Sequence, residues 1–223
     1  RDATDTGFDY KGKRFLLIDT AGIRHNMKLK ESVDFFGSVR SKEAIKRCDV
    51  AVVLIDGFDG LREDDSRIIN SVIDEGRALV VAVNKWDLVK EAETARYKEM
   101  LISKLNLIKN YPVIFMSSKT GKNVPPVLDA AWTAYEKSKI IFKPDELISI
   151  LETLNNSPEI RNRSIKFLYL AQKAALPPTF VLGVKKSGIM NENLRRYAEN
   201  FLRRARDFEG VPIRVSFEGK SKH

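Results

Sequence analysis

The residues best suited to chemistry fall in three short groups, each directly after an apolar run. The run RFLLI is followed by Asp19, Thr20, Ala21 and Gly22. The run ALVVAV is followed by Asn84, Lys85, Trp86 and Asp87, and the run VIFM is followed by Ser117, Ser118 and Lys119. Short apolar runs of this kind are typical of buried strands. Ligands of an α/β sheet bind outside the carboxyl ends of its strands. Three polar strand ends in one chain therefore predict a shared ligand site.

The group Asn84–Asp87 predicts recognition of guanine. The carboxylate of Asp87 offers two acceptor oxygens, which match the adjacent N1–H and N2–H₂ donors of guanine. Adenine has no such pair of donors, so it would leave this carboxylate unpaired. The alkyl stem of Lys85 can lie along the base plane, and Asn84 can hold neighbouring loops together.

The other two groups fit the same ligand, although each is ordinary by itself. In the segment Ser117, Ser118 and Lys119, a backbone N–H near Ser118 can donate to guanine O6, and Lys119 can cover the other face of the base. Asp19 can hold Mg²⁺ through water, because hard cations prefer oxygen ligands. Gly22 lets the backbone approach a terminal phosphate, so Asp19–Gly22 is predicted as a phosphate segment. Both groups are also ordinary turn sequences. The prediction of a nucleotide site therefore depends on the three groups occurring in this order, each after its own strand.

Residues 1–140 alternate between expected strands and helices. The expected strands are 14–19, 50–56, 78–83 and 113–118, and the expected helices are 35–47, 63–75, 91–108 and 124–138. Strands that are apolar without alternation are usually covered on both faces, as in parallel sheets. This pattern predicts an α/β domain with a doubly wound, mostly parallel sheet.

Residues 141–223 have a different pattern, which predicts a small α+β domain. A helix begins at Pro144, strands follow at 165–172 and 179–184, and a second helix capped by Asn191 precedes a strand at 213–217. The aromatic side chains of Tyr169, Phe180 and Phe201 are expected in its core.

The charge of the chain favours an anionic partner. The net charge is +9, and residues 143–223 carry +6 of it. A basic surface can bind nucleic acid or can simply be solvated, and both readings stay open. The candidate RNA contacts are Lys185, Lys186, Arg195, Arg196, Arg203 and Arg204. The single cysteine, Cys48, cannot form an internal disulfide, which favours a reducing compartment.

The three groups, in this order, resemble the motifs of the P-loop GTPase superfamily. RDATDTGFDYKGKRFLLIDTAGIRH is similar to the second GTPase domain of the Der (EngA) family of double GTPases. KFLYLAQKAALPPTFVLGV and ENFLRRARDFEGVPIRVSFEGKSK are similar to its C-terminal KH-like domain. The resemblance implies a cytoplasmic GTPase with GTP or GDP and Mg²⁺ as ligands. It also implies action in large-subunit ribosome assembly with contact to rRNA, docking of the KH-like domain on the GTPase domain, and no membrane or DNA partner.

Three departures from the family pattern limit this expectation. The phosphate-binding pattern G-x-x-x-x-G-K-[ST] does not occur in the 223 residues. We therefore expect the chain to start inside the second GTPase domain, with the first domain absent, and to be inactive alone. Ile23 stands where many GTPases have glutamine, so no catalytic side chain is assigned; the resemblance implies backbone groups, water and a cation such as K⁺. Gly183 and Gly188 do not form the G-x-x-G loop of KH domains.

Two alternatives remain open at this level. The chain could be a non-catalytic RNA-binding module with a degenerate GTPase scaffold, although a scaffold has no need of a guanine-reading carboxylate. It could also belong to a membrane-associated transport GTPase. Against this, no apolar run approaches the roughly 20 residues of a membrane span.

Overall fold

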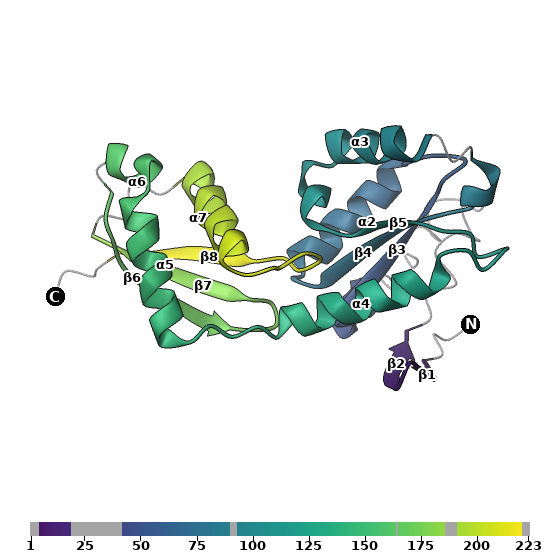
Figure 1. Cartoon of the computed structure of the whole chain (residues 1–223), viewed down its shortest axis with the longest axis horizontal. Helices are drawn as coiled ribbons and strands as arrows, with labels where there is room; N and C mark the ends of the chain where they lie inside the picture. Colours follow the sequence, from purple (N-terminus) through teal and green to yellow (C-terminus); the bar gives the residue numbers. More distant parts are fainter. Residues whose placement is uncertain (1–4, 19–41, 90–92, 164, 186–190, 220–223) are drawn as a thin grey trace.

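A computed structural model describes residues 5–18, 42–89, 93–163, 165–185 and 191–219 (Figure 1). The residues predicted to hold phosphate and Mg²⁺, Asp19–Gly22, lie outside these ranges, as do Ile23 and Lys186. The described elements form two groups, one around strands β3–β5 and one around strands β6–β8.

The first group is built on a parallel sheet. Strands β3 (Val50–Asp56), β4 (Ala78–Asn84) and β5 (Val113–Phe115) pair in the order β3-β4-β5. Strand β4 lies in the centre, and its residues from Ala78 to Val83 are at most 2% exposed. The β3 and β4 bounds agree with the sequence prediction to within one residue.

Helices cover both faces of this sheet. Leu79, Val81 and Val83 of β4 pack in one cluster with α2 (Glu63–Asp74) and α3 (Thr94–Lys104). Val80 and Ala82, on the opposite face, pack with α4 (Val124–Ser138). Because side chains alternate between the faces of a strand, burial of both faces requires an unbroken apolar run. The predicted doubly wound α/β fold is confirmed.

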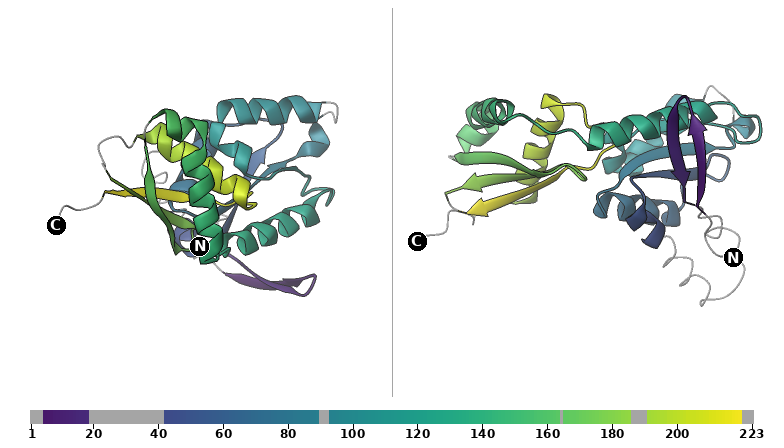
Figure 2. Two further views of the ribbon diagram at one scale, coloured as in Figure 1. Left: turned by 60° about the vertical axis from the view of Figure 1, so that its left-hand side comes forward. Right: turned by 90° about the horizontal axis from the view of Figure 1, so that it is seen from below.

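The assignment of residues 14–19 to the parallel sheet was wrong for the described residues. Strands β1 (Thr6–Tyr10) and β2 (Lys13–Leu17) form a separate antiparallel hairpin. This hairpin lies beside α4 (Figure 2), where the ring of Phe15 is 5.6 Å from that of Trp132. The tertiary contact with α4, and not the apolar run alone, decides where this hairpin lies.

Two other boundaries differ from the prediction. The helix expected over 91–108 is interrupted at Leu105, whose φ of −126° and ψ of 78° are not helical, and a 3₁₀ helix η3 (Asn106–Asn110) follows. Strand β5 ends at Phe115 and not at 118, because the N–H of Ser117 turns to the carbonyl of Lys122. Within the described part of 35–47, residues 42–47 are helical.

The second group is a three-stranded mixed sheet with helices on one face (Figure 2). Strands β6 (Phe167–Ala174) and β7 (Thr179–Val184) pair antiparallel, and β7 and β8 (Arg214–Gly219) pair parallel. Helices α5 (Pro144–Asn156), α6 (Pro158–Asn162) and α7 (Glu192–Ala205) complete the group. The predicted α+β architecture is confirmed, and the predicted cap forms, since Asn191 accepts from the N–H of Leu194 at 3.0 Å.

The aromatic core prediction holds for two of three side chains. Phe180 is fully buried and Phe201 packs against the same core. Tyr169 is 41% exposed, so its assignment to the core was wrong. Its ring lies over Gly183, where a Cβ would come within 2.1 Å of it, and its hydroxyl donates to Glu218 at 2.6 Å. The absent side chain at Gly183 makes room for this arrangement on the face of the sheet away from the helices.

The loop between α7 and β8 joins the two groups. The carbonyl of Gly210 accepts from Leu79 N–H, and Gly210 N–H donates to the carbonyl of Asn110, both at 2.8 Å. Lys137 of α4 adds an ion pair with Asp207 at 2.7 Å. Leu79 is near the amino end of β4, so the second group contacts the sheet at the end opposite to the polar strand ends. None of the described helices is both long and apolar enough to span a bilayer.

Candidate functional site

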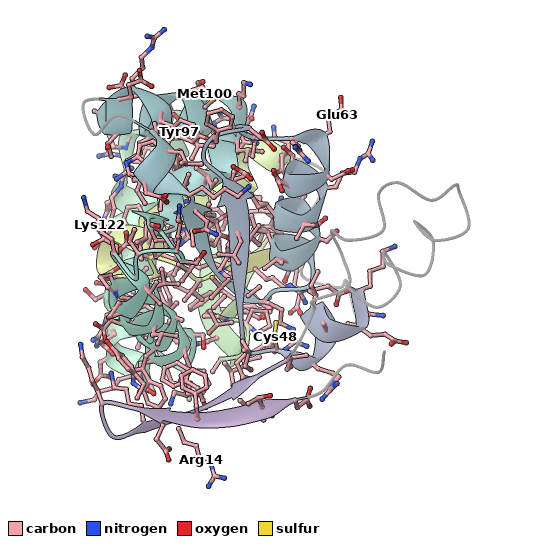
Figure 3. The ribbon with its side chains drawn as sticks, turned by 90° about the vertical axis from the view of Figure 1, so that its right-hand side faces the viewer. Arg14, Cys48, Glu63, Tyr97, Met100 and Lys122 are labelled. Atoms are coloured by element: carbon pink, nitrogen blue, oxygen red, sulfur yellow. The ribbon has the colours of Figure 1, made fainter. Side chains whose placement is uncertain are left out.

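The polar carboxyl ends of β3, β4 and β5 are tied together by hydrogen bonds. Gly57 N–H, just after β3, donates to the carbonyl of Asn84 at 2.8 Å. Trp86 N–H donates to the carbonyl of Met116 at 3.0 Å, and Ser118 N–H donates to Asn84 Oδ1 at 2.9 Å. The three loops form one connected surface at this end of the sheet. Figure 3 is viewed from this side, with Lys122 labelled in the loop after β5 and Tyr97 labelled in α3.

Asn84 and Ser117 shape this surface. Asn84 bridges to the loop after β5, as the sequence predicted. Ser117 is 1% exposed, and its hydroxyl accepts from Thr120 N–H at 3.2 Å, so it stabilises the turn and does not face a ligand. Because the N–H of Ser118 is already donated to Asn84, that particular group is not free for guanine O6. Lys119, in the same loop, is exposed.

Asp87 presents its carboxylate to solvent at the polar ends of the strands. It lies in the short 3₁₀ helix η1 (Trp86–Leu88) and is exposed. Among the described residues, no hydrogen bond or ion pair occupies its carboxylate. Trp86 anchors the other side of η1: its ring is 4.3 Å from that of Phe115, and its indole N–H donates to Thr94 at 3.2 Å. The helix is therefore held from beneath, and within the described part of the chain both oxygens of Asp87 remain available as acceptors.

Lys85 is fixed in an unusual conformation. Its φ of 59° and ψ of 30° place it in the left-handed region, which costs most residues with a Cβ about 1–2 kcal/mol. Its ammonium nitrogen lies 2.6 Å from Oδ2 of Asp56, and the Lys85 side chain is 54% exposed.

Asp56 is not among the site residues predicted from the sequence. The signal was nonetheless present, since Asp56 ends the apolar run VAVVLID in the same way that Asn84 ends ALVVAV. Burial by itself raises the pKa of Asp56, whose side chain is 8% exposed. The ion pair with Lys85 and the N–H groups of Asp59 and Phe58 outweigh burial, so the pKa lies below its ordinary value. Asp56 is consequently ionised at neutral pH.

One segment nearly matches a phosphate-binding loop. Gly7, Gly12 and Lys13 have the required spacing, but Arg14 stands where the pattern needs Ser or Thr. The structure places this segment in the β1–β2 hairpin, with positive φ at Lys11 and Gly12 as in a type I′ turn. A phosphate-binding loop instead joins a strand to a helix, so the segment is not one.

The predicted RNA-contacting residues differ in their surroundings. Lys185, Arg196 and Arg204 are exposed. Arg195 is also exposed, and it pairs with Glu192 at 2.6 Å. Arg203 is different, because its side chain is 11% exposed and donates to the carbonyls of Phe208 and Val211, at 2.9 Å each. Arg203 stabilises the loop that joins the two groups, and we withdraw it from the RNA contacts.

Each of the two groups of elements matches a known protein family. A family model described as "Elongation factor Tu GTP binding domain" matches residues 2–137. A second, "KH-domain-like of EngA bacterial GTPase enzymes, C-terminal", matches residues 144–218. The chain belongs to the Der (EngA) family. The predicted family is thereby confirmed.

Similar Der proteins extend over nearly all of the chain. "GTPase Der" of Fusobacterium nucleatum is 37% identical over 227 residues, covering 99% of this chain and 52% of that protein. "GTPase Der" of Caldanaerobacter subterraneus is 35% identical over 221 residues, covering 97% and 50%. The chain thus spans about half the length of the Der relatives that it matches.

A solved structure supports the GTPase-type fold. Translation elongation factor SelB from Methanococcus maripaludis, in complex with the GTP analogue GppNHp, has a TM-score of 0.51 and 20% identity. The matched region covers 63% of this chain and 29% of the SelB chain. Among the residues that the structure describes here, no group of three or more His, Cys, Asp or Glu side chains could hold a metal ion. The predicted Mg²⁺ residue, Asp19, lies outside them.

Proposed function

We propose that the protein containing this chain binds and hydrolyses GTP, and that the base binds between η1 and the loop after β5. The observation that carries the proposal is the Asp87 carboxylate, held by η1 on a hydrogen-bonded surface and left free among the described residues. Membership of the Der family and the match to a GTP-binding domain model support it.

The chain's own residues would select guanine as follows. Asp87 accepts from N1–H and N2–H₂ of the base, and Lys85 and Lys119 cover its two faces. Asn84 and Ser117 hold the loops that carry these groups. A site built around paired hydrogen bonds rejects bases that cannot make them, because the protein groups are left unpaired.

Hydrolysis is proposed for the whole protein. Asp19–Gly22 would lie at the phosphates, with Asp19 holding Mg²⁺ through water and Gly22 offering its N–H to the terminal phosphate. Mg²⁺, when bound, supplies positive charge at the phosphates. Ile23 cannot orient a water molecule by hydrogen bonding, so we expect slow intrinsic hydrolysis. The resemblance to Der proteins implies that a cation such as K⁺ assists at the phosphates.

We further propose that this GTPase acts as a switch in assembly of the large ribosomal subunit in the cytoplasm. The KH-like family match and the net charge of +6 on residues 143–223 support an RNA partner. The proposed rRNA contacts are Lys185, Lys186, Arg195, Arg196 and Arg204. The first GTPase domain of Der proteins is the proposed partner within the same polypeptide. A non-catalytic RNA-binding module would not need the free Asp87 carboxylate, which favours the GTPase.

The guanine assignment is tested by exchanging the acceptor at position 87. In the whole protein, Asp87→Asn is expected to weaken GDP binding at least about a hundredfold and to improve binding of xanthosine diphosphate. Calorimetric titration of both nucleotides measures this change. Asp59→Asn, which removes an exposed carboxylate paired with Arg62 in the loop after β3, is the matched control. An Asp87→Asn protein with unchanged base preference would refute the assignment.

A further inference from the structure

We infer that Asp56 is a positioning residue for guanine binding, acting through the ammonium group of Lys85. The inference rests on the proposed function and assigns a role to a residue outside the three sequence groups. Asp56 ends β3, whereas Lys85 follows β4, so the ion pair joins two neighbouring strand ends.

The two carboxylate oxygens of Asp56 have different partners. Oδ1 accepts from Phe58 N–H at 3.0 Å and from Asp59 N–H at 3.3 Å, which fixes both the loop and the carboxylate. Oδ2 lies 2.6 Å from Lys85 Nζ. With Oδ1 held by two backbone groups, Oδ2 is offered at a defined place beside the Asn84–Asp87 segment.

Lys85 needs such an anchor in order to act on a base. A lysine side chain loses rotamer entropy when its stem is held along a ring. An anchor at the ammonium end removes part of this loss before the nucleotide binds, and preorganisation of this kind raises affinity. The Lys85 side chain is half-exposed on a left-handed backbone, while Asp56 neutralises its charge.

The substitution Asp56→Asn separates the two tasks of the side chain. Asparagine keeps an oxygen that can accept from Phe58 and Asp59, but it removes the charge that holds Lys85. In the whole protein, calorimetry at 10 °C should show roughly tenfold weaker GDP binding, as expected for loss of one charge-assisted bond. Circular dichroism checks that the variant is folded at that temperature. Asp64→Asn, which removes an exposed carboxylate paired with Arg67 on α2, should bind GDP like the wild type.

A double-mutant cycle distinguishes positioning from a general structural effect. If Asp56 acts through Lys85, then Asp56→Asn causes no further loss of GDP affinity in a Lys85→Met background. The inference is overturned if Asp56→Asn binds GDP normally, or if its loss is the same with and without Lys85. Wild-type protein that binds no guanine nucleotide would overturn the proposed function together with this inference. Normal wild-type binding with a silent Asp56→Asn variant overturns the inference alone.

Discussion

At the scale of single residues, Gly57 has no room for a side chain beside the candidate site. A Cβ at this position would lie 2.8 Å from the backbone oxygen of Asn84 and 3.0 Å from the Trp86 ring. The same Asn84 oxygen accepts the N–H of Gly57 at 2.8 Å. A side chain here would push apart the ends of β3 and β4, which carry Asp56 and the proposed base-reading residues.

We therefore predict that Gly57→Ala lowers the free energy of unfolding by about 1–3 kcal/mol, the usual cost of overpacking. It should also weaken GDP binding, because Asn84 and Trp86 are displaced. Urea unfolding and calorimetry measure the two effects. Gly7→Ala is the control, since a Cβ there meets only one atom within 4 Å, at 3.9 Å. Equal stability of the two variants would contradict the prediction.

The ionisation of Asp56 predicts a pH-dependent contribution to stability. Its pKa in the folded state is below the ordinary value, so the unfolded chain binds the proton more tightly. The stabilisation is therefore present above the unfolded pKa of about 3.9 and is lost as the pH falls through the folded value.

Asp56→Asn should accordingly be less stable than wild type by about 1–2 kcal/mol at pH 7, the size of a charge-assisted hydrogen bond. The difference should shrink below about pH 4, where the wild-type carboxylate also becomes protonated. Chemical unfolding at a series of pH values measures it. A difference that stays constant down to pH 2.5 would show that ionisation of Asp56 does not contribute.

At the scale of elements, the helices depend on local signals and on the sheets they cover. Helix α7 shows both. Asn191 caps its amino end through a hydrogen bond from Leu194 N–H, and Leu194, Ala198 and Leu202 bury one face. The helix ends at Ala205, five residues before Gly210, because the chain then leaves to form the loop that contacts β4.

Removal of this cap should destabilise the KH-like domain. Asn191→Ala is expected to lower its free energy of unfolding by about 1 kcal/mol, the usual value for an N-cap. Urea unfolding followed by circular dichroism measures the change. Asn193→Ala, an exposed position in the first turn of the same helix, should have an effect within about 0.5 kcal/mol of zero. If both variants behave alike, the cap is not what stabilises this helix end.

At the scale of the whole molecule, contact between the two groups depends on Gly210. Its φ of 82° is in the left-handed region, and a Cβ would lie 2.9 Å from that of Ala134. Its backbone bonds to both Leu79 and Asn110. Arg203 holds the loop on one side through the Phe208 and Val211 carbonyls. Strand β4 thus contacts the KH-like domain near one end and carries the proposed base-reading residues at the other.

Gly210→Ala should separate the two groups more than it damages either one. We expect hydrogen exchange of the β4 amide at Leu79 to accelerate at least about tenfold, since a loss of 1.4 kcal/mol corresponds to that factor. Gly12→Ala is the matched control. Gly12 also has a positive φ, of 71°, but a Cβ added there would have no neighbouring atom within 4 Å. Unchanged exchange at Leu79 would show that the Gly210 contact does not hold the groups together.

Local sequence determined the elements and the position of the proposed base-reading group. Strands β3, β4 and β7 follow from apolar runs, Asn191 from its capping chemistry, and Asp87 from a carboxylate placed directly after a buried strand. Each of these depends on side chains within a few residues of one another, which the chain order alone specifies.

Tertiary structure decided which of these residues meet. The Asp56–Lys85 pair joins two strand ends, Arg203 turns inward to carbonyls of the following loop, and Tyr169 is exposed over Gly183. The β1–β2 hairpin lies beside α4 because Phe15 contacts Trp132, more than a hundred residues later. Periodicity shows which side chains face the interior or the solvent. It does not specify the partner that a side chain meets across the fold, because that depends on how separate elements pack.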